Sequence, residues 1–416
     1  MRASTTRAAI PPASSISVAD ISQVTGPLPL YPLQEAGLFG FMNRSGETVI
    51  APQYLRVSSF FDGAARVLVE IEGAERWGYI DSHGEWIAPP RWDDARDFAE
   101  GRARVQSGLH WGFIDGGGNL VIPCAYENAF GFSESLSAVF ADGKWGFIRS
   151  DGELAIEHRF DEADSFSETR SVVRFGSRWG YIDPNGAFAV EPTWENAIAF
   201  SEGLARIERR SLRGFVSRDG ECVIEPQYLD ARDFHERRAA VLMRTDGGDA
   251  WGYIDQSGQR VIEPRYRVAG DFVESRARVG FGEKVGFIDP DGDAVVGPEW
   301  DRAADFSEGR AAVSRGGTWG YVDRDGAVVI EPRFDRAWPF VDGLAEVEIG
   351  DEWGYVDTAG DWVRRTRNEA RSRQTEPPKR FYETFGGLVT DETRRDPKDM
   401  RTLPLIHPQQ SGSEDE

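Results

Sequence analysis

The chain has 416 residues, of which 40% are hydrophobic and 12% aromatic, and this is the composition of a folded protein. Its net charge is −22, and an acidic chain repels nucleic acid and anionic membranes. No apolar run reaches about 18 residues, so we expect no membrane span.

Residues 1–27 are rich in Ser, Thr, Ala and Pro and lack the apolar segment of a secretion signal. We therefore expect a flexible N-terminal arm. The two cysteines, Cys124 and Cys222, are too few to staple a chain of this length, which favours a cytoplasmic location.

From residue 28 to residue 363 the sequence repeats a Trp-Gly motif ten times. Successive copies start 34 residues apart, except at two places where the separation is 38. A fixed period of this kind indicates tandem units that pack on their neighbours. The copies start at Phe39, Trp77, Trp111, Trp145, Trp179, Arg213, Trp251, Val285, Trp319 and Trp353.

Each unit contains three predicted strands. The first resembles residues 204–207 (Leu-Ala-Arg-Ile), the second resembles residues 319–323 (Trp-Gly-Tyr-Val-Asp), and the third resembles residues 329–332 (Val-Ile-Glu-Pro). The turn before the third strand contains Gly in all ten copies, which allows a positive φ. Proline cannot donate a ladder hydrogen bond, so we expect pairing to end at the Pro of the third strand.

A longer link joins each unit to the next and reads Tyr/Phe/Trp-Asp-x-Ala-x-x-Phe-Ser-Glu-Gly. Its small residue lies between two aromatic residues, so we expect the link to pack closely on the strands. The extra four residues of the two longer units fall in the turn before the Trp strand. An insertion at that hairpin tip leaves the packed part unchanged.

These features predict an all-β fold of ten three-stranded antiparallel meanders in a tandem array, elongated or superhelical. The alternative is a closed β-propeller. Against a propeller, 34 residues is short for a four-stranded blade of about 40–45, and ten units exceed the usual four to eight. The array also begins and ends on whole units, so no strand is obviously left over to close a ring.

The recurring pattern resembles that of the WG-repeat proteins, also called KWG-repeat proteins, which are mostly bacterial. The resemblance covers about residues 28–363 and is strongest at 144–148, 178–183 and 319–335. The copies at Phe39, Arg213 and Val285 depart from its Trp. The resemblance implies a β-rich repeat protein and almost nothing about activity.

Repeated acids are the first candidates for chemistry. The Asp that ends the Trp strand is followed at residues 289–293 by a segment similar to a calcium loop, but the full spacing of such a loop is absent. We interpret this Asp as a cap of the turn. It recurs as Asp81, Asp115, Asp183, Asp255, Asp289, Asp323 and Asp357.

A second acid closes the Phe-Ser-Glu segment of every link. Paired carboxylates can perform acid–base catalysis, but nine equivalent acids indicate a shared structural or solvation role. These link acids are Asp62, Glu100, Glu134, Glu168, Glu202, Glu236, Glu274, Glu308 and Asp342.

Histidine and cysteine give no catalytic or metal pattern. The five histidines occupy different repeat positions without zinc-site spacing, and no Gly-x-Ser-x-Gly, Walker or His-Glu-x-x-His motif is present. We expect no catalytic residue, no cofactor and no metal, and we interpret Cys124 as a packed side chain. The histidines are His83, His110, His158, His235 and His407.

Residues 364–416 are predicted to form a charged, disordered C-terminal tail. Its first part is basic and runs into an aromatic pair, so it either is solvated or docks on the acidic array or on a partner. The candidate partner-binding residues are Arg364, Arg365, Arg367, Lys379, Arg380, Phe381 and Tyr382.

We predict a non-catalytic scaffold for a protein or peptide partner, because repeat arrays present extended surfaces and no unique polar constellation is visible. A second hypothesis is binding of carbohydrate or cell-envelope glycan, since Trp and Tyr can stack on sugars. The third is a carboxylate-dependent hydrolase, which requires two acids from non-equivalent positions within about 5–10 Å.

Overall fold

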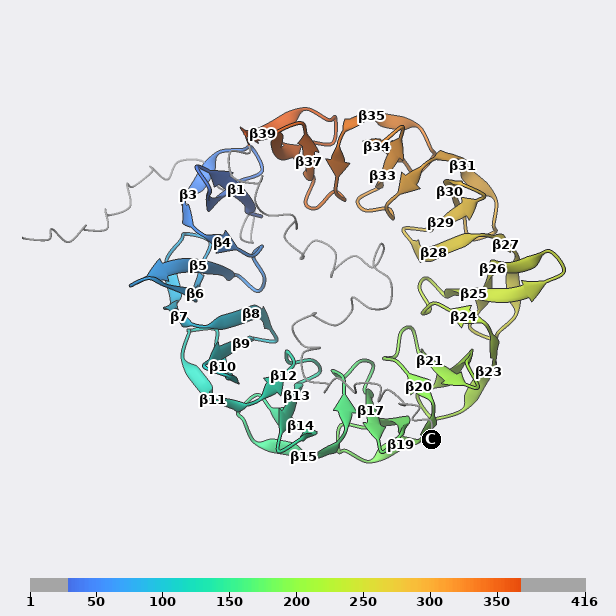
Figure 1. The fold of residues 1–416 in the computed structure, drawn as a ribbon, viewed down its shortest axis with the longest axis horizontal. Coiled ribbons are helices and arrows are strands. Elements are labelled where there is room, and N and C mark those ends of the chain that lie inside the picture. The colour runs from blue at the N-terminus through green and yellow to red at the C-terminus, as the bar shows by residue number, and fades with distance from the viewer. Residues whose placement is uncertain (1–28, 368–416) are drawn as a thin grey trace, which may run out of the picture.

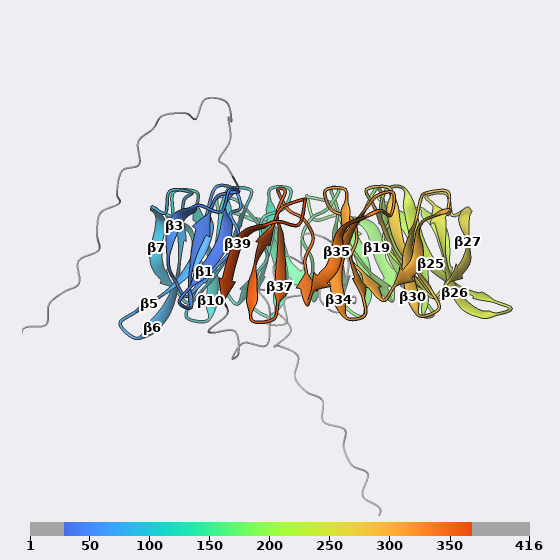
Figure 2. The same cartoon turned by 90° about the horizontal axis from the view of Figure 1, so that it is seen from above.

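The structure is a computed structural model that describes residues 29–367, and within this range every regular element is a β-strand. The strands form ten small antiparallel sheets arranged in a ring (Figure 1). Viewed from the side the ring is flat (Figure 2). The expectation of an all-β fold is confirmed, and the expectation of an open superhelical array is wrong.

Nine of the ten sheets have four strands, not three. The additional strand is the Asp-x-Ala part of each link, and it forms the inner strand of the sheet. It is only two residues long in seven sheets, too short for an alternating pattern in the sequence. The inner strands are β4 (Arg56–Val57), β8 (Asp94–Ala99), β12 (Asn128–Ala129), β16 (Glu162–Ala163), β20 (Asn196–Ala197), β24 (Asp230–Ala231), β28 (Val268–Val273), β32 (Arg302–Ala303) and β36 (Arg336–Ala337).

The second and third strands of each sheet form a hairpin. The second strands are β1 (Tyr31–Glu35), β5 (Ala65–Ile71), β9 (Arg102–Ser107), β13 (Leu136–Ala141), β17 (Ser171–Phe175), β21 (Leu204–Arg209), β25 (Arg238–Thr245), β29 (Arg276–Phe281), β33 (Arg310–Arg315) and β37 (Ala345–Ile349). The third strands carry the Trp-Gly pair or its substitute and are β2 (Leu38–Met42), β6 (Ala74–Ile80), β10 (His110–Asp115), β14 (Lys144–Arg149), β18 (Arg178–Ile182), β22 (Leu212–Ser217), β26 (Gly248–Asp255), β30 (Lys284–Ile288), β34 (Thr318–Asp323) and β38 (Glu352–Val356).

The fourth strand of each sheet lies at the outer rim. The outer strands are β3 (Thr48–Tyr54), β7 (Trp86–Trp92), β11 (Leu120–Tyr126), β15 (Leu154–Phe160), β19 (Phe188–Trp194), β23 (Cys222–Tyr228), β27 (Arg260–Tyr266), β31 (Ala294–Trp300), β35 (Val328–Phe334) and β39 (Trp362–Arg367). We call each sheet a blade and number the blades along the chain, so that blade 1 is β1–β3 and blade 10 is β36–β39. The two 38-residue units are blades 2 and 7, and their lengthened hairpins β5–β6 and β25–β26 project from opposite sides of the ring, as predicted for insertions at that turn (Figure 1).

The Pro of the outer strand does not end pairing, contrary to expectation. In β27 the strand continues beyond Pro264 to Tyr266, which pairs with Trp251, and the register shifts between Trp251 and Tyr253. At this bulge Gly252 lies against the outer strand, where an added Cβ would be 2.6 Å from the carbonyl oxygen of Ile262. The bulge needs no N–H from Pro264, and it explains why Gly follows the Trp.

The hydrophobic cores lie between neighbouring blades. One buried cluster joins Phe215 and Ile224 of blade 6 to Phe234 and Val241 of blade 7. Phe215 and Phe234 meet edge to face with ring centroids 4.8 Å apart. An equivalent aromatic pair occupies each interface from blades 1 and 2 to blades 9 and 10. Each blade is therefore stabilised by its neighbours, as the repeat pattern predicts.

The ring closes where blade 10 meets blade 1. The hydroxyl of Tyr31 donates a hydrogen bond of 2.7 Å to the main-chain oxygen of Asp342, and its ring packs on Tyr355 with centroids 5.6 Å apart. Leu33 and Leu344 share the same buried cluster. No strand crosses this seam, so side-chain packing alone completes the ring in the described part of the chain.

Candidate functional site

The link acids connect each blade to the next. The carboxylate of Glu202 accepts the backbone N–H groups of Glu236 and Arg237, both at 2.7 Å. Glu202 itself has a left-handed backbone with φ of 52°, which places its side chain over the following blade. The predicted structural role of these acids is confirmed.

The same contact recurs around one face of the ring, which we call the acidic face because it carries the nine link acids. Glu100, Glu134, Glu168, Glu236, Glu274 and Glu308 also accept backbone N–H groups of the next link turn. Seven of the nine acids are exposed, and Glu168 and Glu274 are half-buried. A belt of negative charge therefore surrounds the axis on this face while its carboxylates hold the blades together.

The Asp at the end of the Trp strand caps the following turn, as predicted. Asp183 accepts the N–H groups of Asn185 and Ala187 at 2.9 and 3.0 Å. Asp289, in the segment that resembles a calcium loop, makes the same two contacts with Asp291 and Asp293. Within residues 29–367, no group of three or more His, Cys, Asp or Glu side chains is arranged to hold a metal ion.

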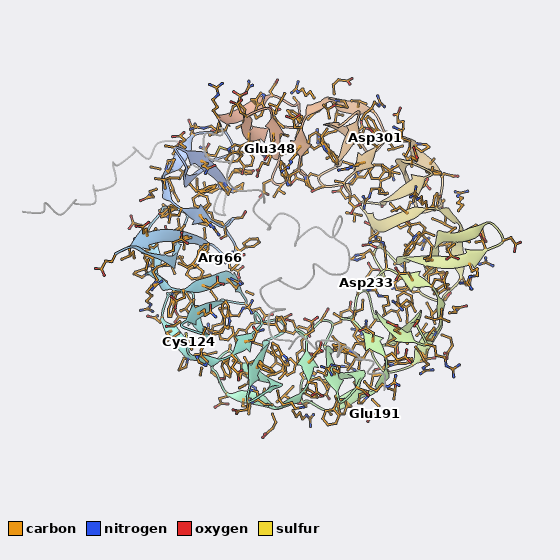
Figure 3. The ribbon with its side chains drawn as sticks, viewed as in Figure 1. Arg66, Cys124, Glu191, Asp233, Asp301 and Glu348 are labelled. Carbon is orange, nitrogen blue, oxygen red and sulfur yellow. The ribbon has the colours of Figure 1, made fainter. Side chains whose placement is uncertain are left out.

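Charged side chains on the inner side of the ring depart from the repeat. An Arg of the second strand reaches an Asp in the link of the next blade: Arg278 Nε lies 3.5 Å from Asp305, and its guanidinium donates to the oxygen of Ala303 at 3.0 Å. Arg206 and Asp233 form the equivalent pair one interface earlier but one, at 3.8 Å. Asp233 is placed at the inner edge of the ring (Figure 3).

Asp271 belongs to the same position of the link, but blade 7 offers Ala240 where its neighbours offer an Arg. Its carboxylate lies instead 4.0 Å from the guanidinium of Arg232 and 3.9 Å from Nε2 of His235. We call this group the inner charged cluster; it consists of Arg206, Arg232, Asp233, His235, Asp271, Arg278 and Asp305. It spans blades 6 to 9 and is the part of the inner surface where the repeat is least regular.

Burial gives the inner charged cluster unusual electrostatics. Burial raises the pKa of Asp305 to about 6; Arg278 opposes the rise, and the nearby charge of Asp271 adds to it. Burial also raises the pKa of Asp97, whose partner across the blade 2–3 interface is Arg66 at 2.8 Å. The cluster can therefore change its charge near neutral pH.

The inner charged cluster was not recognised from the sequence, although a signal was present. The residue before the link Phe is Asp in four units, and the residue three before the end of the Leu-Ala-x-Val segment is irrelevant to that pattern, whereas its third residue is Arg in four units. Tabulating these two positions together identifies three consecutive units with Asp. The four acids are Asp97, Asp233, Asp271 and Asp305, and the four bases are Arg66, Arg104, Arg206 and Arg278.

The candidate partner-binding residues divide into two groups. Arg364, Arg365 and Arg367 lie on β39, so the last strand continues past Val363 and these residues are not part of a tail. Arg364 pairs with Glu35 across the seam, Arg365 pairs with Glu352, and Arg367 pairs with Asp351 at 2.9 Å. The others, Lys379, Arg380, Phe381 and Tyr382, lie outside the described residues.

Histidine and cysteine do not form a common site among the described residues. Only His235 belongs to the inner charged cluster, whereas His83 lies near Asp81 in an outer turn and His407 lies outside the described residues. Cys124 is placed toward the outer rim (Figure 3) and is partly buried, like Cys222. Burial raises the pKa of both thiols.

Most of the aromatic surface is inside the protein. Of the thirteen Trp residues, Trp86 alone is classed as exposed, at 42%. The others pack in or against the interblade cores; Trp300, for example, is fully buried. The described residues therefore offer few aromatic rings on which a sugar could stack.

Ten antiparallel sheets closed into a ring define the protein as a ten-bladed β-propeller. The model of the WG-containing repeat family matches residues 39–70, 77–108, 111–145, 145–178, 179–211, 214–244, 251–284, 286–319 and 319–353. Because these segments make up more than half of the sequence, the chain belongs to the WG-containing repeat family. The resemblance found in the sequence is confirmed.

Several solved structures share a distant likeness. The tricorn protease aligns with a TM-score of 0.30 and 12% identity over 77% of this chain and 44% of its own. The extracellular domain of a hybrid two component system protein from B. thetaiotaomicron aligns with a TM-score of 0.25 and 10% identity over 82% and 62%. Hsv2 of Kluyvelomyces marxianus aligns with a TM-score of 0.33 and 7% identity over 56% and 95%.

The chain spans less than two thirds of the length of the first two of these structures. Likenesses at these scores support no conclusion about this chain. No curated protein matches the sequence. Among residues 29–367, the structure contains no helix that could cross a membrane.

Proposed function

We propose that this propeller is a non-catalytic scaffold that binds a protein or peptide through the inner charged cluster and the adjoining acidic face. The observation that carries the proposal is the loss of periodicity at the cluster: Asp271 faces Arg232 and His235, where the equivalent acids face an Arg of the preceding blade. A binding site for one partner requires such a unique patch on an otherwise repeated surface.

The chemistry of the proposed partner follows from the surrounding charge. The belt of link acids and the net charge of −22 favour a polypeptide that presents Lys or Arg side chains, and disfavour nucleic acid. The mixed signs of the cluster add positional specificity, because a wrong partner would leave Asp271 or Arg232 opposite a like charge. We place the protein in the cytoplasm and assign it no cofactor, as parts of the same proposal.

The other two hypotheses receive less support. Glycan binding rested on the many Trp and Tyr side chains, and Trp86 is the single exposed Trp. The hydrolase hypothesis required two acids from non-equivalent positions. The acids that influence each other here, Asp271 and Asp305, occupy equivalent positions in neighbouring blades.

A quantitative affinity experiment tests the scaffold proposal. Full-length wild-type protein, the double variant Arg232→Ala/His235→Ala and the control Glu191→Gln, altered at the outer rim, are immobilised and exposed to an extract of the source cells (Figure 3). We expect a specific polypeptide to be retained by the wild type and the control and lost from the double variant. Equal retention by all three proteins, or a catalytic turnover abolished by the double variant, would contradict the proposal.

A further inference from the structure

Blade 1 lacks the inner strand that the other nine blades possess. Its sheet order is β1-β2-β3, whereas each other blade places an inner strand against its second strand. Within residues 29–367, β1 therefore presents an unpaired edge toward the axis. Such an edge is a template for an additional strand.

The path of the chain indicates what completes this edge. After every outer strand from β3 to β35, a single residue leads into the inner strand of the next blade: β3 ends at Tyr54 and β4 begins at Arg56, and β35 ends at Phe334 and β36 begins at Arg336. The outer strand of blade 10, β39, ends at Arg367. In a closed ring the next blade is blade 1.

We infer that residues 368–370 form the missing inner strand of blade 1. One residue after Arg367, Asn368, leaves Glu369-Ala370 at the position of the inner strand. This dipeptide is identical to the inner strand Glu162–Ala163 of blade 5, and six of the seven two-residue inner strands end in Ala. Residues 368–370 lie outside the described residues, and the assignment rests on the edge of β1 and on connectivity.

The register of the new pairing follows from the other blades. In blade 4, Asn128 pairs with Phe140 and Ala129 with Val139, and Phe140 is opposite the Trp of the third strand. In blade 1 the residue opposite Phe39 is Gln34. Glu369 therefore pairs with Gln34, and Ala370 pairs with Leu33.

Tyr31 explains why the tail needs no link Phe. Three residues after Ala370 stands Arg373, where the links carry a Phe that packs on the third strand of the preceding blade. At the seam the ring of Tyr31 packs on Tyr355 in that place, 5.6 Å away. The residue equivalent to Tyr31 in the other nine blades is Ala or Ser, such as Ala205.

The N-terminal segment fits the edge less well. The spacing between Ala197 and its partner Ile207, measured back from Leu33, leads to Gln23 and not to an Ala. Two prolines, Pro27 and Pro29, also lie in the stretch that would form the link turn. The C-terminal segment is therefore the occupant to which we commit.

A disulfide test distinguishes these occupants in the full-length chain. With Cys124 and Cys222 replaced by Ser, the pair Gln34→Cys/Glu369→Cys places two thiols on residues paired in the inferred ladder, about 5.5 Å apart at Cα and within reach of a disulfide. We expect it to form under mild oxidation about tenfold faster than the control Gln34→Cys/Ser411→Cys, because pairing raises the effective concentration. Equal rates would overturn the inference, and so would faster closure of Gln34→Cys/Ser22→Cys.

Hydrogen exchange provides a readout that needs no cysteine. In the inferred ladder the amide of Gln34 donates to Glu369, and Glu369 donates back. The variant Glu369→Pro removes that second donor, so we expect the Gln34 amide to exchange about tenfold faster than in wild type, whereas Ser413→Pro leaves it unchanged. Rapid exchange of Gln34 in wild type and both variants would overturn the inference.

Discussion

Tyr31 donates a hydrogen bond to the main-chain oxygen of Asp342 from the far end of the folded chain, and this contact joins the first blade to the last. Burial raises the pKa of Tyr31 to about 12, with Asp342 adding to the effect. The hydroxyl is therefore a stable donor at neutral pH. The seam is built from side chains of the same kinds that hold the other interfaces together.

Tyr31→Phe removes this hydrogen bond and keeps the aromatic packing on Tyr355. We expect the free energy of unfolding to fall by about 1 kcal/mol, since the Asp342 carbonyl loses its partner. The comparison is Tyr181→Phe, which removes a 2.8 Å bond to Ile198 at an interior interface. Exchange of amides in blades 1 and 10 should quicken in Tyr31→Phe and not in Tyr181→Phe, and identical exchange maps would show that the seam is not held by this contact.

Glu202→Ala tests the acid belt as an interblade connection. The substitution leaves the N–H groups of Glu236 and Arg237 without their carboxylate acceptor, so we expect a loss of about 1–3 kcal/mol in the free energy of unfolding. Chemical denaturation measures the loss, and Glu191→Ala at the outer rim serves as the control with a change within about 0.5 kcal/mol. If Glu202→Ala behaves like the control, the belt is a solvated surface and not a structural connection.

Gly252→Ala tests why Gly follows the Trp of the motif. The new Cβ would lie 2.6 Å from the carbonyl oxygen of Ile262 and 2.8 Å from the nitrogen of Pro264, and backbone atoms cannot move aside cheaply. We expect destabilisation of about 1–3 kcal/mol, measured by thermal unfolding. Gly297→Ala is the matched control, because nothing lies within 4 Å of its added Cβ. Similar melting temperatures for the two variants would contradict the bulge explanation.

The sequence predicts local structure in this protein better than global shape. The strand composition, the turn glycines and the interblade core could all be predicted because each leaves a periodic pattern, as with Phe215 and Phe234. The inner strands could not, because most are two residues long and show no alternation. Counting three strands in a unit then made 34 residues look too short for a blade.

Ring closure depends on the rotation between neighbouring blades, and no residue type encodes that angle. It results from the combined geometry of contacts such as Glu202 with Arg237 and Phe215 with Phe234, which become visible only in three dimensions. The site was missed for a different reason. Asp271 and Arg232 are ordinary link residues one at a time, and their meaning appears when neighbouring units are compared.

The titration of Asp305 predicts a pH-dependent stability. Its folded-state pKa is about 6, whereas the ordinary value is 3.8, because burial disfavours the carboxylate. As pH rises between these values the unfolded chain loses its proton first, so the contribution of this group to the free energy of unfolding is greatest below the lower value and is lost as pH rises through the higher one. Asp305→Asn cannot ionise, and we expect its melting temperature to fall less than that of the wild type between pH 4 and pH 6.

Asp301 provides a control of opposite sign in the same blade. A hydrogen bond from Lys284 and another from the Gly316 amide hold the pKa of Asp301 below its ordinary value. Its contribution is present above that ordinary value and is lost as pH falls, so Asp301→Asn should weaken the decline in stability on the acid side instead. Thermal melts of the wild type and the two variants across this range separate the effects. If Asp305→Asn and the wild type show parallel curves from pH 4 to pH 6, Asp305 is ionised throughout, and the inner charged cluster does not change its charge near neutral pH.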